Sequence, residues 1–156
     1  MPTRYQGTAE EVQALNAYIK LQRAAETVLM RTTAHLADYG LTVSQFAILE
    51  ALYHLGTLSQ RDLAEKLLKS TGNMSIVLKN VEKQGLISRQ RNPDDNRYMR
   101  VCITDTGRDL IESLFDKHVA GIVAEMGILT TEEQVQLDGL CRKLGLRLDE
   151  DALGEA

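Results

Sequence analysis

The chain has 156 residues, of which 44% are hydrophobic and 26% charged, and it carries a net charge of −4. This length and composition predict one globular domain with a buried core, and the scarcity of Pro and aromatic residues favours helices. No apolar run is long enough to span a membrane and Met1 to Gly7 lacks the pattern of a secretory signal, so we expect a cytoplasmic protein.

The charge is distributed unevenly along the chain. Between Gly56 and Thr104 nine Lys or Arg stand against five Asp or Glu, so this stretch carries +4 and the remainder carries −8. A basic centre within an acidic frame is expected of a DNA-binding module attached to a scaffold that does not bind DNA. The alternative is an uneven surface charge without a function.

The first helix is expected from about Thr8 to Asp38, where apolar residues follow helical spacing. Gly40 is placed to end it in a left-handed cap. Thr42 to Gln45 forms a capping-box pattern, which predicts the start of a second helix that Gly56 ends.

Two further helices are predicted before the hydrophobic period changes from that of helices to that of strands. Ser59 to Asp62 resembles the capped start of a short third helix, and Ser70 precedes a fourth, which Gly85 ends. The apolar residues of the fourth helix share one face, which must turn inward. These residues are Met74, Val77, Leu78 and Val81.

After Gly85 the hydrophobic period becomes that of strands. Leu86 to Arg91 and Tyr98 to Thr104 are predicted strands, and the turn-forming residues from Asn92 to Asn96 predict a hairpin between them. Thr104 is the expected cap of a fifth helix, and a capping box from Thr130 to Glu133 opens a sixth. The predicted fold is mainly α with a small antiparallel β-hairpin: a winged helix-turn-helix core with helical extensions at both ends.

Several short motifs occur in order at fixed spacing. They are L-T-x-x-Q-F-x-I-L (Leu41 to Leu49), L-A-E-K-L (Leu63 to Leu67), E-K-x-G-L-I (Glu82 to Ile87), D-x-R (Asp95 to Arg97) and I-T-x-x-G (Ile103 to Gly107). Together they resemble the core of MarR-family transcription regulators. The resemblance implies a single domain over residues 1–156, with a winged helix-turn-helix core at about 41–104 and dimerisation helices at about 8–38 and 105–148.

The outward face of the fourth helix is the expected reader of DNA. A helix fits the major groove, where each base pair shows a distinct pattern of donors and acceptors. Asn73 and Ser75 can read base edges, whereas Lys79 suits a phosphate. The candidate contacts on this helix are Ser70, Thr71, Gly72, Asn73, Ser75, Ile76 and Lys79. The alternative is that Ser70 is only an N-cap and that Asn73 is only a solvated polar residue.

The hairpin is the expected wing. The resemblance implies that Arg97 enters the minor groove and that Asp95 holds its guanidinium in place. An Arg at a hairpin tip can reach the narrow, electronegative minor groove of A·T-rich DNA. Arg89 and Arg91 share a face of one strand and are candidate phosphate contacts, or alternatively a solvated pair.

The terminal helices are the expected dimer interface. Two-fold DNA sites require two-fold proteins, with copies about 34 Å apart on neighbouring turns. The interface candidates are Val12, Leu15, Ile19, Leu137, Leu140 and Leu144. Alternatively these residues complete the core of the monomer.

The resemblance also implies an input that releases the protein from DNA: a small aromatic or lipophilic effector, thiol oxidation or a metal. In the family an effector usually binds between the dimer helices and the DNA-binding lobe. The candidate polar contacts there are His35, Tyr39, Tyr53, His54 and His118. Cys102 is the redox candidate, because a strand face opposite Val101 and Ile103 would expose its thiol.

Other classes of function find little support in the residues. Three isolated His residues without ligand spacing do not predict a metal site, and no cofactor or catalytic set is expected. We therefore predict a ligand-responsive, homodimeric repressor that binds double-stranded DNA at an inverted repeat. The alternative is a winged-helix module for protein–protein interaction, against which the basic residues of the wing and fourth helix argue.

Overall fold

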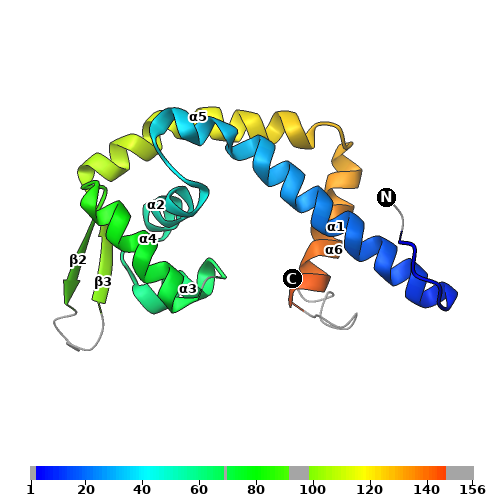
Figure 1. The fold of residues 1–156 in the computed structure, drawn as a ribbon. Coiled ribbons are helices and arrows are strands. Elements are labelled where there is room, and N and C mark those ends of the chain that lie inside the picture. Colours follow the sequence, from blue (N-terminus) through cyan, green and yellow to red (C-terminus); the bar gives the residue numbers. More distant parts are fainter. Residues whose placement is uncertain (1–2, 69, 92–98, 147–156) are drawn as a thin grey trace, which may run out of the picture. The chain divides into compact units, whose positions relative to one another are not determined.

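The computed structural model describes residues 3–68, 70–91 and 99–146 (Figure 1). Two compact units divide the chain, Met1–Val119 and Ala120–Ala156. The single domain expected from the sequence stays a prediction. Within the described ranges no helix has the length and apolar character that crossing a membrane requires.

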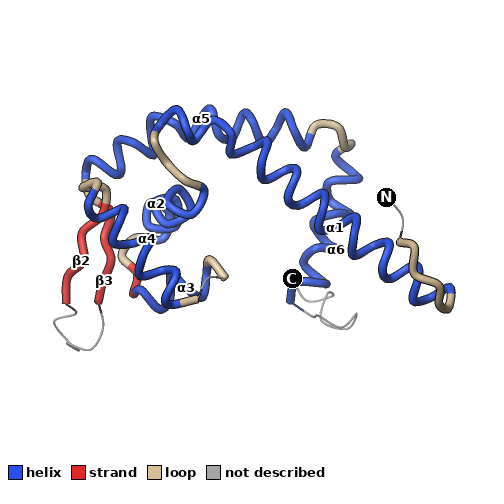
Figure 2. The backbone as a smooth tube through the Cα atoms, in the orientation of Figure 1, coloured by secondary structure: helices blue, strands red, loops and turns tan. Residues whose placement is uncertain are grey.

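Most of the described chain is helical, and the strands form one small sheet (Figure 2). The first unit contains α1 (Ala9–Thr33), the 3-10 helix η1 (Ala34–Tyr39), α2 (Val43–Leu55), β1 (Leu58–Ser59), α3 (Gln60–Lys66), α4 (Thr71–Lys83), β2 (Ile87–Arg91), β3 (Met99–Ile103) and most of α5 (Asp105–Met126). The second unit contains the end of α5 and α6 (Thr131–Leu146). The predicted class, mainly α with a small antiparallel sheet, is confirmed.

Reciprocal hydrogen bonds fix the first turn of four helices. In each, the N-cap hydroxyl accepts a bond from the backbone N–H three residues on, and that residue's side-chain oxygen accepts one from the N-cap N–H. The pairs are Thr8 with Glu11, Thr42 with Gln45, Ser59 with Asp62 and Thr130 with Glu133. These bonds confirm the predicted starts of α1, α2, α3 and α6.

The first helix ends earlier than its apolar pattern predicts. The Thr32 hydroxyl donates to the carbonyl oxygen of Val28 at 2.8 Å, and that of Thr33 donates to the carbonyl of Leu29 at 2.6 Å. Hydroxyls bonded back to these carbonyls compete with the regular helical bonds, and the chain continues as the tighter η1. Gly40 then closes η1 in the left-handed region, with φ +67°, as predicted.

The sheet has the strand order β1-β3-β2, and both pairings are antiparallel. In the hairpin Arg89 lies opposite Val101, and Leu58 of β1 lies opposite the same residue on the other side. Sequence patterns did not predict β1, because two residues are too few to show an alternation. This short strand fixes the start of α3 against the wing, since Ser59 both ends β1 and caps α3.

The hydrophobic core lies in the first unit, where α2, α3, α4, the sheet and α5 meet. Its best-buried side chains include Leu49, Leu52, Leu63, Ile111 and Leu114, each with no exposed surface. Full burial of such a side chain stabilises the fold by about 1.5–3 kcal/mol. This core holds the two candidate DNA-binding elements, α4 and the hairpin, on one support.

The second unit has no buried side chain on α6. The Gln134 side chain connects α6 to the preceding turn, because its amide donates to the carbonyl oxygens of Met126 and Leu129 at 3.2 Å each. The apolar side chains of α6 are left exposed to solvent. They are Val135, Leu137, Leu140, Leu144 and Leu146.

Candidate DNA-binding interface

The fourth helix divides into a buried and an exposed face, as predicted. Met74, Leu78 and Val81 are at most 2% exposed, and Val77 is half-buried. The opposite face consists of exposed residues, and Ile76 has 64% of its surface in solvent. The exposed candidates are Ser70, Gly72, Asn73, Ser75, Ile76 and Lys79, whereas the Thr71 side chain lies outside what the structure describes.

Ser70 caps α4 through a single bond. Its hydroxyl accepts from the backbone N–H of Asn73 at 3.3 Å. In the turn that leads to this helix, Leu68 has φ +50°, a conformation that non-Gly residues seldom adopt, and its side chain is 94% exposed. The turn between α3 and α4 is therefore backbone-strained, and it presents the large apolar side chain of Leu68 shortly before α4, the candidate recognition helix.

The wing strand β2 is attached to α4 by an ion pair. The Arg89 guanidinium donates to the Glu82 carboxylate, with Nε to Oε2 at 2.9 Å, and 22% of the Arg89 side chain is exposed. This hydrogen bond holds the pKa of Glu82 below its ordinary value, more than burial raises it. A phosphate contact by Arg89 remains a prediction, and the phosphate would have to share the guanidinium with the Glu82 carboxylate. Arg91, two residues on, is exposed.

The predicted wing-tip residues Asp95 and Arg97 lie outside the described residues, as does Tyr98. The strands that flank this segment are well placed for a wing. Arg91 at the end of β2 lies opposite Met99 at the start of β3, so the hairpin pairs along all five residues of each strand.

A compact junction joins the recognition helix, the wing and α5. The Thr104 hydroxyl donates to the Gly85 carbonyl oxygen at 2.7 Å and accepts from the backbone N–H of Gly107 at 3.1 Å. Gly85 itself is left-handed, with φ +74°. At Gly107 an added Cβ would collide with the carbonyl oxygen of Leu86, so only glycine fits there. The direction of the wing relative to α4 is thereby fixed by backbone contacts.

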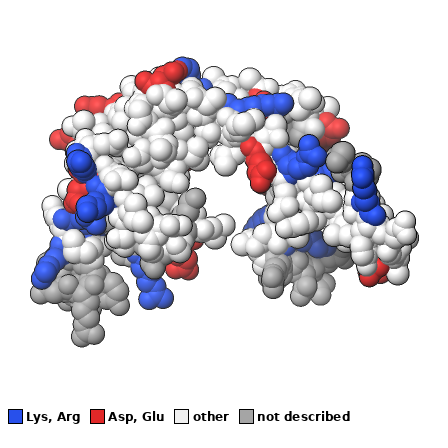
Figure 3. Space-filling view, in the orientation of Figure 1, with Lys and Arg blue, Asp and Glu red and all other residues white. Residues whose placement is uncertain are grey.

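Basic side chains gather over the part of the first unit that carries α4 and the wing strands (Figure 3). The exposed cations on these elements are Lys79, Lys83, Arg91 and Arg100. Such a surface attracts the phosphate backbone of nucleic acid irrespective of base sequence.

The five predicted effector contacts come together in one aromatic cluster. The His118 ring contacts those of His35 and Phe46 at a tilt, with ring centroids 5.2 and 4.6 Å apart, respectively. Tyr53 and His54 meet 5.0 Å apart, and Phe115 lies 5.2 Å from His54 and 6.5 Å from His118. Tyr39 contacts His35 edge-on at 6.5 Å.

Two ring nitrogens of this aromatic cluster, Nε2 of His35 and Nδ1 of His118, are buried and find no hydrogen-bond partner among the residues that the structure describes. Buried polar atoms are nearly always paired, so each of these nitrogens could bond a guest molecule. Burial lowers the pKa of His118 and the neighbouring His35 lowers it further, against opposing effects of Glu50 and a backbone hydrogen bond at Thr32. His118 is therefore favoured in its neutral form, in which one ring nitrogen accepts a hydrogen bond.

Cys102, the redox candidate, is half-buried on β3, and its sulfur lies 3.2 Å from the Thr57 hydroxyl oxygen. The strand alternation in the sequence predicts a more exposed thiol. Among the described residues no group of three or more His, Cys, Asp or Glu could hold a metal ion.

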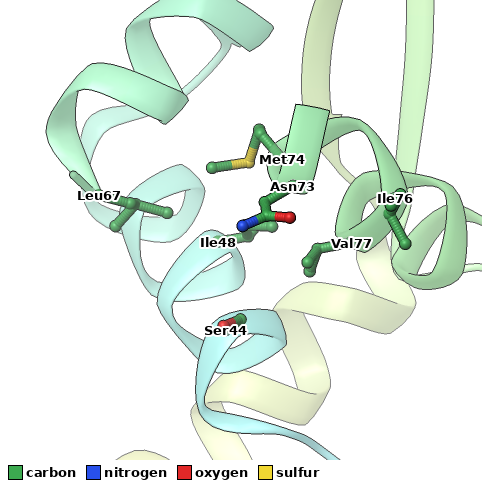
Figure 4. A pocket seen from close by; sticks show the side chains of 7 residues that line it. All are labelled: Ser44, Ile48, Leu67, Asn73, Met74, Ile76 and Val77. Carbon is green, nitrogen blue, oxygen red and sulfur yellow. The ribbon is translucent and has the colours of Figure 1, made fainter. Parts of the chain in front are cut away.

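A pocket between α2 and α4 was not predicted (Figure 4). Its volume is about 170 Å³, and the side chains around it are those of Ser44, Ile48, Leu67, Asn73, Met74, Ile76 and Val77. No motif signals such a pocket, because its lining combines buried, half-buried and exposed residues of α2, α4 and the turn after α3.

The predicted dimer residues are incompletely covered within the chain. Val12, Leu15 and Ile19 of α1 are half-buried. On α6, Leu137 is 37% exposed, Leu140 66% and Leu144 63%. The alternative that the α6 residues complete the monomer's own core therefore gains no support.

Comparisons with known proteins agree with the fold. The family model described as "MarR family" matches residues 41–98. The HTH-type transcriptional regulator MhqR of Bacillus subtilis is 29% identical over 134 residues, which is 86% of this chain and 92% of that protein. A protein of the same organism named as an uncharacterized HTH-type transcriptional regulator, YkoM, is 30% identical over 138 residues, 88% of this chain and 90% of that protein.

A solved structure is also similar over most of its length. It is that of BpsR from Bordetella bronchiseptica, whose DNA binding is regulated by 6-hydroxynicotinic acid. BpsR is 25% identical to this chain, and the two structures match with a TM-score of 0.76 over 83% of this chain and 98% of that chain. The winged helix-turn-helix geometry, the match to the family model and the nearly full-length similarity to YkoM lead to one conclusion: the chain belongs to the MarR family of transcriptional regulators.

Proposed function

We propose that this regulator binds a short inverted repeat in double-stranded DNA as a homodimer and represses transcription until an effector releases it. The observation that carries the proposal is the two-faced α4: Met74 and Val81 are held in the core, whereas Asn73 and Lys79 face solvent beside a basic wing. A helix locked in this way presents its polar face to a groove without reorganising.

Each exposed position of α4 suits a distinct contact. The Asn73 amide can pair with an adenine edge, and the Ser75 hydroxyl can bond either kind of base edge. Ile76 offers an apolar surface to thymine methyl groups. Lys79 sits farther along the helix, where its ammonium would neutralise a phosphate.

The wing completes the contact in our proposal. Arg97, outside the described residues, enters the minor groove with Asp95 as its partner. The hairpin that carries it is fastened to α4 through Arg89 and Glu82, so helix and wing approach two adjacent grooves together.

The homodimer is supported by the exposed apolar residues of α6. Leu140 and Leu144 leave more than 60% of their surface in solvent on a helix without a buried residue. Covering them with a second copy would remove this apolar surface from water. A dimer also carries two copies of α4, as a two-fold DNA site requires.

The effector site in our proposal is the aromatic cluster around His35 and His118. An aromatic acid or phenol would stack on the rings and bond to the two unpartnered nitrogens. The similarity to BpsR, whose DNA binding is regulated by 6-hydroxynicotinic acid, supports this class of ligand. The thiol of Cys102 has no assigned role in this proposal.

A protein–protein module without DNA binding is not favoured, because the relatives MhqR and YkoM are both named transcriptional regulators. We further propose that the protein has no catalytic activity of its own and acts in the cytoplasm.

Selection of bound duplexes from a random pool tests the proposal directly. An inverted repeat among the selected sequences is expected, with half-sites about 10 base pairs apart from centre to centre. The Asn73→Ala variant should lose preference at one position in each half-site, whereas a control variant, Lys20→Ala on α1, should select the same repeat. Failure to enrich any sequence at low and moderate salt would refute sequence-specific binding.

A further inference from the structure

Glu82 is the single acidic residue of the elements proposed to bind DNA. All the other charged residues of α4, β2 and β3 are Lys or Arg. Glu82 follows Ser75 and Lys79 at helical spacing, so it lies on the same side of α4 as these proposed base and phosphate contacts. A carboxylate in this position repels DNA phosphates unless a cation of the protein neutralises it.

Arg89 is the cation that neutralises Glu82. Its Nε and Nη2 both donate to one carboxylate oxygen, Oε2, at 2.9 and 2.5 Å. A guanidinium carries more N–H groups than these two bonds use. Because 22% of the Arg89 side chain is exposed, the guanidinium could reach a phosphate if Glu82 released it.

The pair is also a second attachment of the wing to α4. At the base of the hairpin, the Thr104 hydroxyl bonds to the Gly85 carbonyl oxygen. Arg89 is instead the middle residue of β2, opposite Val101 of β3. A bond at the middle of a strand restricts the angle between wing and helix more than a bond at its base. This restriction matters for a complex in which helix and wing enter two grooves at once, but not for binding by phosphate charge alone.

We propose that Glu82 is a specificity-determining residue: it retains the Arg89 guanidinium within the protein, where this cation orients the wing instead of binding the phosphates of unrelated DNA. The inference rests on the proposed DNA contact of α4 and the wing. A released guanidinium would strengthen binding to any duplex, because phosphate contacts carry no sequence information. Retaining it lowers the affinity for unrelated DNA, while the oriented wing preserves the affinity for the inverted repeat.

Neutralising Glu82 tests the first part of the proposal on an unrelated duplex. In Glu82→Gln the acceptor loses its charge and Arg89 becomes available, so the slope of log affinity against log salt should steepen by about one unit, as expected for one additional phosphate contact. The gain in affinity should then shrink by a factor of about 3–4 between about 50 and about 200 mM salt. Glu10→Gln, which removes an exposed acid of α1, is the charge-matched control and should keep the wild-type slope.

Two further variants identify the origin of the steeper slope. Glu82→Ala removes the acceptor altogether and should steepen the slope at least as much as Glu82→Gln. The double variant Glu82→Gln with Arg89→Met lacks the released cation, and its slope should return to the wild-type value. Both side chains are partly exposed, so these variants should stay folded, and their urea midpoints verify it. An unaltered slope in both single variants, or a steeper one in the double variant, would overturn the proposal.

Specificity itself is measured as a ratio of two affinities. The duplex selected from the random pool and an unrelated duplex of the same length are titrated at one salt concentration. The ratio of their affinities should fall about threefold or more in Glu82→Gln. An unchanged ratio would refute the role of Glu82 in specificity. A wild-type protein that binds both duplexes equally would instead contradict the proposed function, so the two failures are distinguishable.

Discussion

The Arg89 guanidinium on β2 donates two hydrogen bonds to the Glu82 carboxylate on α4, at 2.9 and 2.5 Å. The contact joins the wing to the recognition helix across a separation of seven residues. Because both side chains are partly exposed, the pair does more to set the direction of the wing than to stabilise the fold. Arg89, which the sequence predicts as a phosphate contact, thus binds Glu82 within the protein and orients the wing.

A double-mutant cycle should show the strength of this pair. For Glu82→Gln and Arg89→Met we expect a coupling of about 0.5–1 kcal/mol in the free energy of unfolding, because the pair is partly solvated. The folded-state pKa of Glu82 is lowered, so the coupling is present above pH 4.5 and disappears as the pH falls through the folded pKa. Urea unfolding at neutral and acidic pH measures it, and additive single variants would show that the pair is not coupled.

Gly107→Ala should destabilise the protein by about 2–4 kcal/mol, because the added methyl group collides with backbone and the junction of α4, wing and α5 must open. Gly72→Ala is the matched control: nothing lies within 4 Å of the added Cβ, and the change should be neutral or stabilising by up to about 1 kcal/mol. Urea unfolding without DNA compares them. Equal stability of the two variants would contradict the role assigned to the junction.

The stability of the protein should fall between about pH 7 and pH 5 in part because of His118. Its pKa is lowered in the folded state, so as the pH drops below 6.5 the unfolded chain takes up the proton first. His118→Gln should therefore lose less stability over this interval than the wild type. Urea unfolding of both proteins over a series of pH values measures the difference. A His118→Gln profile parallel to that of the wild type would exclude this contribution.

Lys79→Ala should weaken DNA binding equally for specific and unrelated duplexes and reduce the slope of log affinity against log salt by about one unit. The physical reason is the loss of one neutralised phosphate and of the counterions it releases. Lys20→Ala, an exposed lysine on α1, is the charge-matched control. Fluorescence anisotropy over a salt series measures the slope, and an unaltered slope would remove Lys79 from the phosphate contacts.

Leu140→Glu should convert the homodimer to monomer by placing a charge in the proposed interface. In an isolated chain this substitution would cost little, because Leu140 is already 66% exposed. Gln136→Glu, on the same helix, adds the same charge at another exposed position and serves as the control. Sedimentation velocity distinguishes the two forms. A dimeric Leu140→Glu protein would place the interface elsewhere.

Local signals in the sequence predicted where most helices begin and where the chain turns. Thr42, Ser59 and Thr130 start their helices through capping bonds that involve residues only three positions away, and Gly40 and Gly85 adopt the left-handed conformation that their positions suggest. Such features depend on chain-local geometry and can be recognised without knowing the fold.

Features that depend on distant contacts escaped prediction. In the sequence Arg89 is predicted to be a solvent-exposed cation, whereas in the fold its strand places it beside Glu82. The strand β1 consists of Leu58 and Ser59 alone and exists only because β3 lies beside it. The pocket beside Ser44 is formed where α2, α4 and the turn after α3 meet, which no periodicity in the sequence predicts.

The sixth helix has 16 residues and no buried side chain. A peptide of that length is only marginally helical in water by itself. If a second copy covers its apolar side, as we propose, the helix and the dimer form together and protein concentration sets how much of each is present. The cellular copy number of the regulator would then influence how much of this helix is folded.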